Sequence, residues 1–249
     1  QILDLESDSR PIAVMINNIG VARKHHVGLQ DAYMVYELIV EGGLTRLMAL
    51  YKDADTAKIG SVRSSRHYYL DYALENDAVY VHWGYSDYAK NDISKLKVAN
   101  INGLIYGNKY FWKDKSLGIS TEHTAYTSME LINKGIDKLG YRKTTEDKPL
   151  LSYSVDSVKV KDMEGAIPAN NISVKYSNSM TTTYEYDSEN GNYKRSVNGT
   201  AHVDYESKEQ YTAKNIITYQ VKNSTISGDN KGRQDLSNVG SGEGYYISE

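Results

Sequence analysis

Near its start the chain contains the run Ile12-Ala13-Val14-Met15-Ile16, which Asn17-Asn18 brings to an end. A short, unbroken apolar run that is closed by polar turn residues is typical of a strand buried on both faces of a sheet. Two further runs of this kind, 59–62 and 78–82, follow along the chain. The first third of the sequence therefore predicts several short buried strands.

Helical signals lie between and after these runs. Helices are expected from residue 64 or 65 to about 75, from 86 to 96, and from about 128 to 139. The last of these opens with the capping box Thr127-Ser128-Met129-Glu130 and stops at Gly140. Strands interleaved with helices predict an α/β or α+β N-terminal domain with a mixed sheet and flanking helices. The turn Glu41-Gly42-Gly43, between strand-like stretches at 34–40 and 44–51, predicts a hairpin within it.

The last hundred residues have a different pattern. Polar and apolar residues alternate at 172–176 and 182–186, and Asn190-Gly191 and Asn198-Gly199 are strong hairpin turns. Strands are also expected at 216–221 and 245–247, and no helix is expected. A smaller all-β C-terminal domain is therefore predicted. Pro149, after the polar run 143–148, places the boundary between domains 1–148 and 149–249.

Composition excludes several classes of function. The 249 residues have a formal net charge of −3, no Cys, and no apolar run near the ~20 residues of a membrane-spanning helix. A near-neutral chain lacks the basic field of a general nucleic-acid binder, so no nucleic-acid partner is expected. Neither the phosphate loop nor the dinucleotide fingerprint occurs, and no metal-ligand spacing occurs, so no cofactor and no metal are expected.

Arginines surround one predicted junction of strand and helix, in the motif Arg63-Ser64-Ser65-Arg66. Free N–H groups at a helix start, with these arginines and Arg46 nearby, suit a phosphate or a carboxylate. The loops at strand ends are also the usual ligand sites of α/β sheets. In the alternative interpretation, Ser64 only caps the helix and the arginines pair with carboxylates, namely Glu37, Glu41 or Asp71.

Two histidines lie beside predicted strand or helix ends. His82-Trp83 ends the strand at 78–82, and His123 precedes the capped helix. Histidines from different loops can supply acid–base chemistry or bind a ligand, and a purely structural role is the open alternative. His82, Trp83 and His123 are therefore candidate ligand-binding residues.

Two carboxylates, Glu37 and Glu41, are four residues apart beside the hairpin turn, so in a strand both would point to the same face. Paired carboxylates can hydrolyse a glycosidic bond at suitable separation. Salt bridges to the arginines of the same domain are the more economical interpretation. Glu41 and His82 are the candidate catalytic residues.

Five segments together resemble the YerB family of bacterial lipoproteins. They are Arg10-Pro11-Ile12-Ala13-Val14-Met15-Ile16-Asn17-Asn18, Val40-Glu41-Gly42-Gly43-Leu44-Thr45-Arg46, Gly60-Ser61-Val62-Arg63-Ser64-Ser65-Arg66, Val81-His82-Trp83-Gly84 and Gly228-Asp229-Asn230-Lys231-Gly232-Arg233. The resemblance implies an exported protein, anchored to the outer face of the bacterial cell membrane by a lipidated Cys upstream of this chain. It also implies further strands after Gly240-Ser241-Gly242, so the C-terminal domain is expected to be truncated. It implies no reaction.

A shorter stretch, from Thr45-Arg46 to Arg63 and Arg66, is similar to part of the LytR-CpsA-Psr phosphotransferases. The resemblance implies arginines that hold a polyprenyl pyrophosphate while a lipid-linked polymer is transferred to the cell wall. It covers only roughly twenty residues, and Leu47 occupies a position where that family has an acidic residue. The likeness is therefore an indication of fold and not of activity.

The leading hypothesis is a membrane-tethered binding or accessory lipoprotein of the cell envelope with an anion-binding cleft. Arg46, Arg63 and Arg66 would hold the anion, the Ser64 region would donate N–H groups, and His82 and Trp83 would line the floor. The partners expected are an anionic wall polymer, a lipid head group or an envelope protein. The alternatives are a cell-wall enzyme, either a phosphotransferase of lipid-linked polymers or a hydrolase, and a protein-partner adaptor without a small-ligand site.

Overall fold

The computed structural model describes residues 4–154, 158–237 and 242–248, which form two compact units. The N-terminal unit comprises Gln1–Leu38, Arg46–Leu151 and Asp204–Glu206. The C-terminal unit comprises Ile39–Thr45, Ser152–Val203 and Ser207–Glu249. The first has a mixed sheet with helices and the second has antiparallel strands, so the predicted fold class is confirmed.

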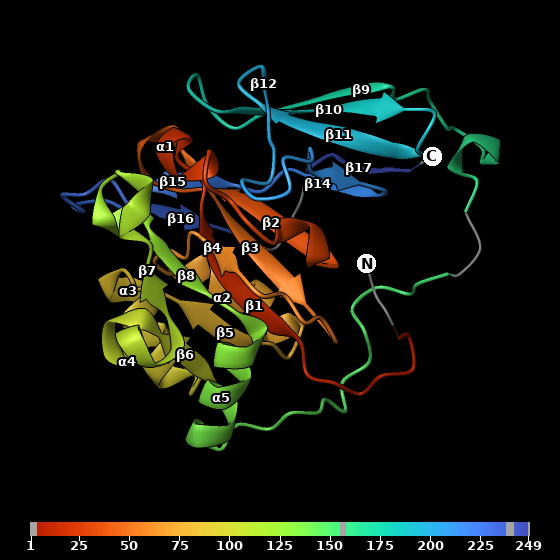
Figure 1. Ribbon diagram of the computed structural model, residues 1–249. Coiled ribbons are helices and arrows are strands. Elements are labelled where there is room, and N and C mark those ends of the chain that lie inside the picture. Colours follow the sequence, from red (N-terminus) through yellow and green to blue (C-terminus); the bar gives the residue numbers. More distant parts are fainter. Residues whose placement is uncertain (1–3, 155–157, 238–241, 249) are drawn as a thin grey trace. The chain divides into compact units, whose positions relative to one another are not determined.

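A five-stranded sheet forms the centre of the N-terminal unit (Figure 1). Its strands are β1 (Ile12–Asn17), β2 (Met34–Ile39), β3 (Thr45–Tyr51), β5 (Val79–His82) and β6 (Asn100–Asn102), in the order β2-β3-β1-β5-β6. β1 pairs antiparallel with β3 and parallel with β5, and β5 pairs parallel with β6. The predicted hairpin is confirmed, with the turn η2 (Glu41–Gly43) between β2 and β3.

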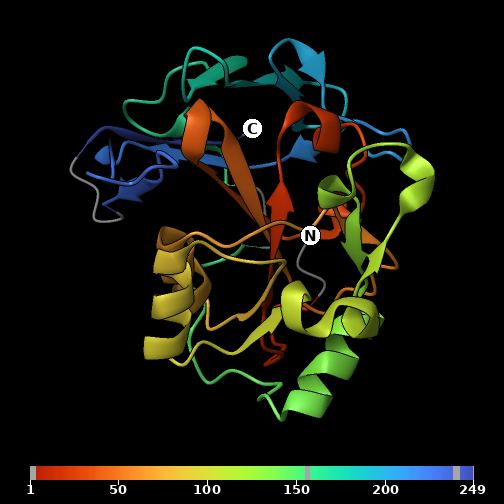
Figure 2. The ribbon, with the colours of Figure 1, turned by 90° about the vertical axis from the view of Figure 1, so that its left-hand side faces the viewer.

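Helices cover both faces of this sheet, which explains the unbroken apolar run of β1. All six residues of β1 are buried. Figure 2 shows α2 (His67–Glu75) and α3 (Asp87–Lys95) on one side of β1, and α4 (Gly103–Tyr110) and α5 (Met129–Leu139) on the other. A strand between two helical layers has no solvent-facing side, so alternation of polar and apolar residues disappears.

Local capping signals set the ends of α3 and α5. The Ser86 hydroxyl accepts a hydrogen bond from the Ala89 N–H at 3.2 Å, and the Ser128 hydroxyl accepts one from the Leu131 N–H at 3.2 Å. Ser128 is therefore the cap of α5, one residue after the Thr127 of the predicted box. Gly140 ends α5 with φ +67°, a left-handed conformation that glycine adopts without strain.

The start of α2 differs from the prediction. The helix begins at His67, and the residue before it, Arg66, makes no side-chain cap bond. Ser65 is instead fully buried, bridges to Tyr85 and accepts a hydrogen bond from the Tyr80 hydroxyl at 2.8 Å. Tertiary contacts thus hold Ser65 in extended backbone, so neither Ser64 nor Ser65 caps this helix.

Tyrosines take the place of phenylalanine in the core of this unit. The largest side chains with less than 2% exposure include Tyr51, Tyr68, Tyr69, Tyr80 and Tyr126. Their hydroxyls reach main-chain acceptors: Tyr69 donates to the Arg46 carbonyl at 2.6 Å, and Tyr51 to the Gly28 carbonyl at 3.0 Å. Such bonds satisfy the polar atom that each buried ring brings with it.

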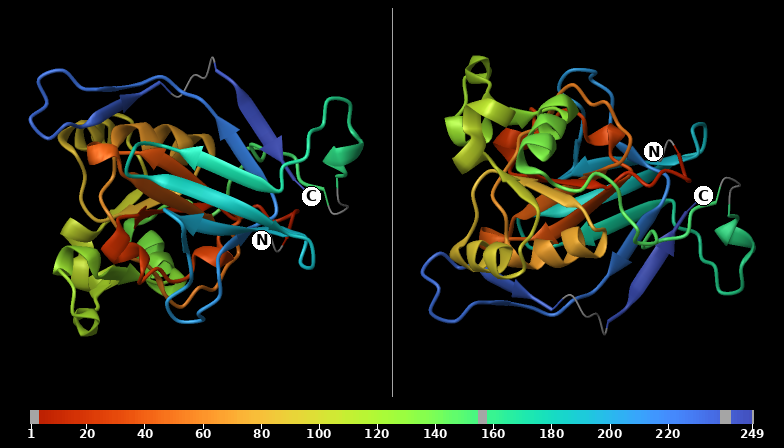
Figure 3. Two further views of the ribbon diagram at one scale, coloured as in Figure 1. Left: turned by 90° about the horizontal axis from the view of Figure 1, so that it is seen from above. Right: turned by 90° about the horizontal axis from the view of Figure 1, so that it is seen from below.

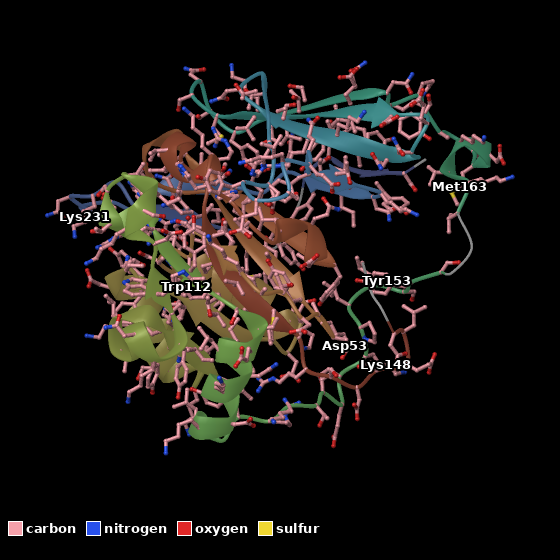
Figure 4. The ribbon with its side chains drawn as sticks, in the orientation of Figure 1. Asp53, Trp112, Lys148, Tyr153, Met163 and Lys231 are labelled. Atoms are coloured by element: carbon pink, nitrogen blue, oxygen red, sulfur yellow. The ribbon has the colours of Figure 1, made fainter. Side chains whose placement is uncertain are left out.

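The N-terminal unit also contains a three-stranded sheet. It has the order β4 (Ile59–Gly60), β8 (Ala125–Thr127), β7 (Trp112–Lys113). Trp112, labelled in Figure 4, stacks on Tyr126 with the ring centroids 6.1 Å apart. The remaining short elements are α1 (Gly20–Arg23), η1 (Leu29–Asp31), η3 (Lys115–Leu117) and η4 (Thr121–His123).

The segment Asp204–Glu206 belongs to the N-terminal unit although it is distant in sequence. The Asp204 carboxylate accepts a hydrogen bond from the Gly28 N–H at 2.9 Å, and Glu206 forms an ion pair with Lys58 at 2.9 Å. No local pattern near residue 204 signals that this segment belongs to the N-terminal unit, because its place depends on partners more than 140 residues away in the sequence.

Antiparallel strands make up the C-terminal unit. One sheet has the order β12 (Thr200–Ala201), β11 (Asn192–Val197), β10 (Thr181–Asp187), β9 (Asn171–Lys175), and β13 (Thr212–Ala213) pairs with β11. Figure 3 shows β9, β10 and β11 side by side. Two-stranded sheets join β14 (Ile216–Tyr219) to β17 (Gly244–Ile247), and β15 (Asn223–Thr225) to β16 (Gln234–Leu236).

The predicted turns of this unit are confirmed. Asn190-Gly191 lies between β10 and β11, and Asn198-Gly199 lies between β11 and β12, with both residues of the second turn at positive φ. The described residues of the unit include the short turn η5 (Val160–Asp162) and no α-helix. Of the segment Gly240-Ser241-Gly242, after which further strands are expected, Gly240 and Ser241 lie outside the described residues. In the described part of the chain, none of the helices has the length and apolar character needed to cross a membrane.

Candidate functional site

Three parallel strands of the N-terminal unit end in polar residues at one edge of the sheet. β1 ends at Asn17, β5 at His82 and β6 at Asn102, and His82 pairs with Asn102. β1 lies between β3 on one side and β5 on the other, so strands that follow β1 in the sequence lie on both sides of it in the sheet. In open α/β sheets, ligands bind at this place, outside the carboxyl ends of the parallel strands. We call it the carboxyl edge.

Asn102 joins two of the segments that form this edge. Its Oδ1 accepts hydrogen bonds from the Gly84 N–H at 3.0 Å and from the Leu104 N–H at 2.9 Å, so it caps α4 and fixes the loop after β5. The side chain is fully buried, and its Nδ2 has no hydrogen-bond partner among the described residues. A buried donor without a partner is uncommon in folded proteins.

Arg63 is fixed at the carboxyl edge by its own main chain. Its N–H donates to the Met15 carbonyl at 2.9 Å, and its carbonyl accepts from the Trp83 N–H at 3.1 Å. The guanidinium reaches Glu122: Nη2 lies 2.7 Å from Oε2 and Nη1 lies 3.1 Å from the main-chain carbonyl. The Arg63 side chain is 25% exposed and that of Glu122 is 54% exposed, so solvent and solutes reach this pair.

His123 lies on the other side of the Glu122 carboxylate. Its Nδ1 is 3.0 Å from Asn17 Nδ2, and because an amide nitrogen only donates, Nδ1 accepts. In the neutral ring the proton is therefore on Nε2, which lies 3.6 Å from Glu122 Oε1. Burial lowers the pKa of His123, Glu122 opposes this, and Arg63 and Lys113 lower the pKa further.

Lys113 on β7 adds a second permanent cation. Its Nζ donates to the Thr121 carbonyl at 2.8 Å and lies 4.1 Å from the centroid of the Trp83 ring. Burial lowers the pKa of this ammonium group, and repulsion from Arg63 lowers it again. Arg63, Lys113 and His123, which we call the basic cluster, thus surround one exposed carboxylate, Glu122.

Trp83 forms a wall beside the basic cluster. Its ring packs so closely on the start of α4 that a Cβ added to Gly103 would lie 2.3 Å from it. The ring also meets Phe111 edge-on, with the centroids 5.5 Å apart. Glycine at position 103 is therefore required by the indole and not by the backbone conformation.

His82 lies in the sheet itself. It is fully buried, its Nδ1 is 2.7 Å from the Gly84 carbonyl, and its Nε2 is 3.1 Å from Asn100 Oδ1. Burial lowers the pKa of this ring, and these two hydrogen bonds only partly oppose the shift. With both nitrogens engaged by the protein, the geometry favours a structural role for His82 over a role as a base.

The other predicted anion ligands support the loop at 63–66. Arg46 pairs with Asn17 across β3 and β1, and its Nη1 donates to the Ser64 carbonyl at 2.7 Å. Arg66 Nη1 donates to the Ser65 carbonyl at 2.8 Å. The structure therefore brings Arg46, Arg63 and Ser64 together at the carboxyl edge. Arg46 stabilises the loop through its hydrogen bond to the Ser64 carbonyl.

Glu41 is placed differently from the prediction. β2 ends at Ile39, and Glu41 lies in the turn η2 of the C-terminal unit, whereas Glu37 lies on β2 in the N-terminal unit. The expectation that Glu37 and Glu41 share one strand face is wrong, because the strand stops before Glu41. Glu37 accepts a hydrogen bond from Asn18 Nδ2 at 3.1 Å.

Several residues of this site were absent from the sequence-based prediction. Lys113 and Glu122 come from segments 50 or more residues after Arg63, and no local pattern connects them. Asn17 had a usable signal, because it follows the apolar run of β1, whereas Asn102 lies in the short strand Asn100–Asn102 and follows no such run. In the described part of the chain, no group of three or more His, Asp or Glu side chains is arranged to hold a metal ion.

Two of the buried histidines, His82 and His123, predict a pH dependence of stability. Since burial lowers the pKa of His82 and of His123, the unfolded chain takes up protons from about pH 6.5 downward while the folded protein does not. Above pH 7 these two rings should add no pH dependence to the free energy of unfolding. Below pH 6.5 each ring should lower the free energy of unfolding by up to about 1.4 kcal/mol per pH unit.

Urea denaturation at pH 7.5 and pH 5.5 measures this loss. His123→Gln, which retains an acceptor for Asn17, should make the loss smaller. An equal or larger loss in the variant would contradict the role given to His123.

Comparison with known proteins gives consistent matches over nearly the whole chain. Residues 3–142 match the family model described as "Protein of unknown function (DUF3048) N-terminal domain", and residues 172–249 match its C-terminal domain. The protein named "Putative lipoprotein YerB" of Bacillus subtilis (strain 168) is 31% identical over 248 residues, which are 97% of this chain and 70% of that protein. The crystal structure of YerB from Bacillus subtilis superimposes with a TM-score of 0.78 at 29% identity, over 92% of this chain and 74% of that one.

Proposed function

The chain belongs to the DUF3048 family, and from that premise we propose that it is an exported, membrane-tethered protein that binds a phosphate-bearing ligand at the carboxyl edge. The name of the Bacillus subtilis relative, a putative lipoprotein, supports export and anchoring at the outer face of the cell membrane. The basic cluster supports the choice of ligand. Binding, and not catalysis, is proposed because His82 has both ring nitrogens engaged.

The observation on which this proposal depends is the position of Glu122. Its carboxylate is 2.7 Å from Arg63 and 3.6 Å from His123, and it interacts electrostatically with Lys113 as well. A phosphate oxygen has the same charge and accepts the same hydrogen bonds. In this proposal the Glu122 carboxylate occupies the position that the phosphate takes when it binds. Because this side chain is exposed on the short turn η4, breaking its ion pair with Arg63 costs little free energy.

Titration with pyrophosphate tests the proposal. Isothermal titration calorimetry on the intact chain should detect saturable binding that weakens as ionic strength rises. Glu122→Gln removes the competing charge and should tighten binding roughly two- to tenfold, since exposed ion pairs contribute about 0.2–1 kcal/mol and repulsion of the ligand is also removed.

The control is Asp137→Asn on α5, which removes an exposed carboxylate from its ion pair with Lys143. It should leave the dissociation constant unchanged. The proposal is wrong if millimolar pyrophosphate does not bind, or if Glu122→Gln weakens the binding.

One observation favours a second function, the docking of a protein partner on the C-terminal unit. The strands β14 and β17 expose Ile217, Tyr219, Tyr245 and Tyr246, each by about half of its surface. Exposed aromatic and apolar side chains gathered on paired strands are typical of interaction surfaces. The pyrophosphate test concerns the N-terminal unit only, so the two functions are separable.

A further inference from the structure

The first turn of α4 presents two apolar side chains to solvent. Leu104 is 62% exposed and Ile105 is 66% exposed, and they are the most exposed of the large hydrophobic side chains described in the N-terminal unit. Exposure of adjacent aliphatic residues is unfavourable, because each loses the stabilisation that burial gives. Their place in the fold therefore needs an explanation.

Leu104 lies close to the loop that follows β5 and to the loop that contains Arg63 and Ser64. A Cβ added to Gly84 would be 3.5 Å from Leu104 Cδ1 and 3.4 Å from Ser64 Oγ, so Leu104 and Ser64 converge on this glycine. Ser64 directly follows Arg63, and Gly84 directly follows Trp83, whose ring contacts Lys113. Leu104 thus lies against the loops that carry Arg63 and Trp83, and Ile105 follows it in the first turn of α4; we call these two residues the apolar ledge.

We infer that the ligand of the carboxyl edge is a lipid phosphate, with its phosphate on the basic cluster and its alkyl chain along the apolar ledge. This inference rests on the proposed function and names its ligand class. A wall polymer is polar along its length and would leave Leu104 and Ile105 exposed. An alkyl chain covers them without requiring hydrogen bonds, while the charge of its head group complements Arg63 and Lys113.

The test compares two ligands with the same head and different tails, ethyl phosphate and octyl phosphate, both below any micelle concentration. Octyl phosphate should bind the intact chain at least about tenfold more tightly, because burial of two methylene groups already corresponds to roughly this factor. Octyl glucoside, which has the same tail and no charge, should bind far more weakly than octyl phosphate.

The double variant Leu104→Ser/Ile105→Ser should reduce the advantage of octyl phosphate to about threefold or less, and should bind ethyl phosphate as the unmodified chain does. Both residues are exposed, so the fold should persist, which circular dichroism verifies. Leu96→Ser, at an exposed leucine after α3, is the matched control and should leave both affinities unchanged.

The outcomes separate the two proposals. Equal binding of ethyl and octyl phosphate, or an octyl advantage that survives in the double variant, overturns the lipid inference and leaves the anion site intact. Failure of ethyl phosphate, octyl phosphate and pyrophosphate alike overturns both.

Discussion

Arg63→Ala is expected to weaken pyrophosphate binding by roughly one to two orders of magnitude. Hydrogen bonds to charged groups contribute about 1.5–3 kcal/mol each, which corresponds to roughly 10- to 150-fold in affinity. The main chain of Arg63 is fixed by Met15 and Trp83, so the guanidinium is presented without further ordering. Loss of this group removes the forked donor of the basic cluster.

The conservative variant Arg63→Lys distinguishes charge from geometry. Lysine keeps the positive charge and loses the planar fork, so its affinity should fall between those of the unmodified chain and Arg63→Ala. The stability of the fold should change by no more than about 1 kcal/mol in either variant, because the Glu122 partner is exposed.

Arg142→Ala is the matched control for Arg63→Ala. Arg142 also pairs with a carboxylate, Asp77, at 2.8 Å, but Asp77 precedes β5 and therefore lies toward the amino ends of the parallel strands. Calorimetric titration should show the same dissociation constant as for the unmodified chain. If Arg63→Ala and Arg142→Ala had equal effects, or if neither had any, Arg63 would not be a ligand of the anion.

Asn102→Ala is expected to lower the free energy of unfolding by about 2–4 kcal/mol. The substitution removes the cap of α4, which contributes roughly 0.5–2 kcal/mol, and leaves the Gly84 N–H without its acceptor, which costs about 1–3 kcal/mol more. The hydrogen bond between the Gly84 N–H and Asn102 is buried, so water replaces it poorly. Urea denaturation measures the change.

Two further variants make this result specific. Asn102→Asp keeps an acceptor for Gly84 and Leu104, so it should recover much of the stability while its added negative charge weakens pyrophosphate binding. Asn108→Ala makes the same substitution at an exposed position of the same helix and should change stability by no more than about 0.5 kcal/mol. Equal losses in Asn102→Ala and Asn108→Ala would exclude the bridging role of Asn102.

The resemblance to the LytR-CpsA-Psr phosphotransferases extends to the position of an arginine and not to its chemistry. Arg46 lies at the carboxyl edge, but its guanidinium donates to the Ser64 carbonyl, and Leu47, where that family has an acidic residue, is buried at 1% exposure on β3. A phosphate-binding role thus depends on Arg63 and Lys113. The proposal is therefore one of binding.

The sequence by itself determined the elements whose signals are local. The run at 12–16, the serine caps of α3 and α5, the stop at Gly140 and the Asn-Gly turns each fix a strand, a helix end or a hairpin. Such signals act over a few residues, so they operate in any context. They were sufficient for the class of both domains and for part of the carboxyl edge, where strands end in polar residues.

The tertiary structure alone decided the rest. α4 contains Gly103 and Gly107, which disfavour a helix, and it forms because the Trp83 ring packs on Gly103 and Asn102 caps it. α2 begins at His67 because the core holds Ser65. Lys113, Glu122 and His123 meet Arg63 only when β7 and η4 pack at the end of β1 and β5. The physical reason is that long-range packing overrides local propensity, and it assembles the site from segments with no pattern in common.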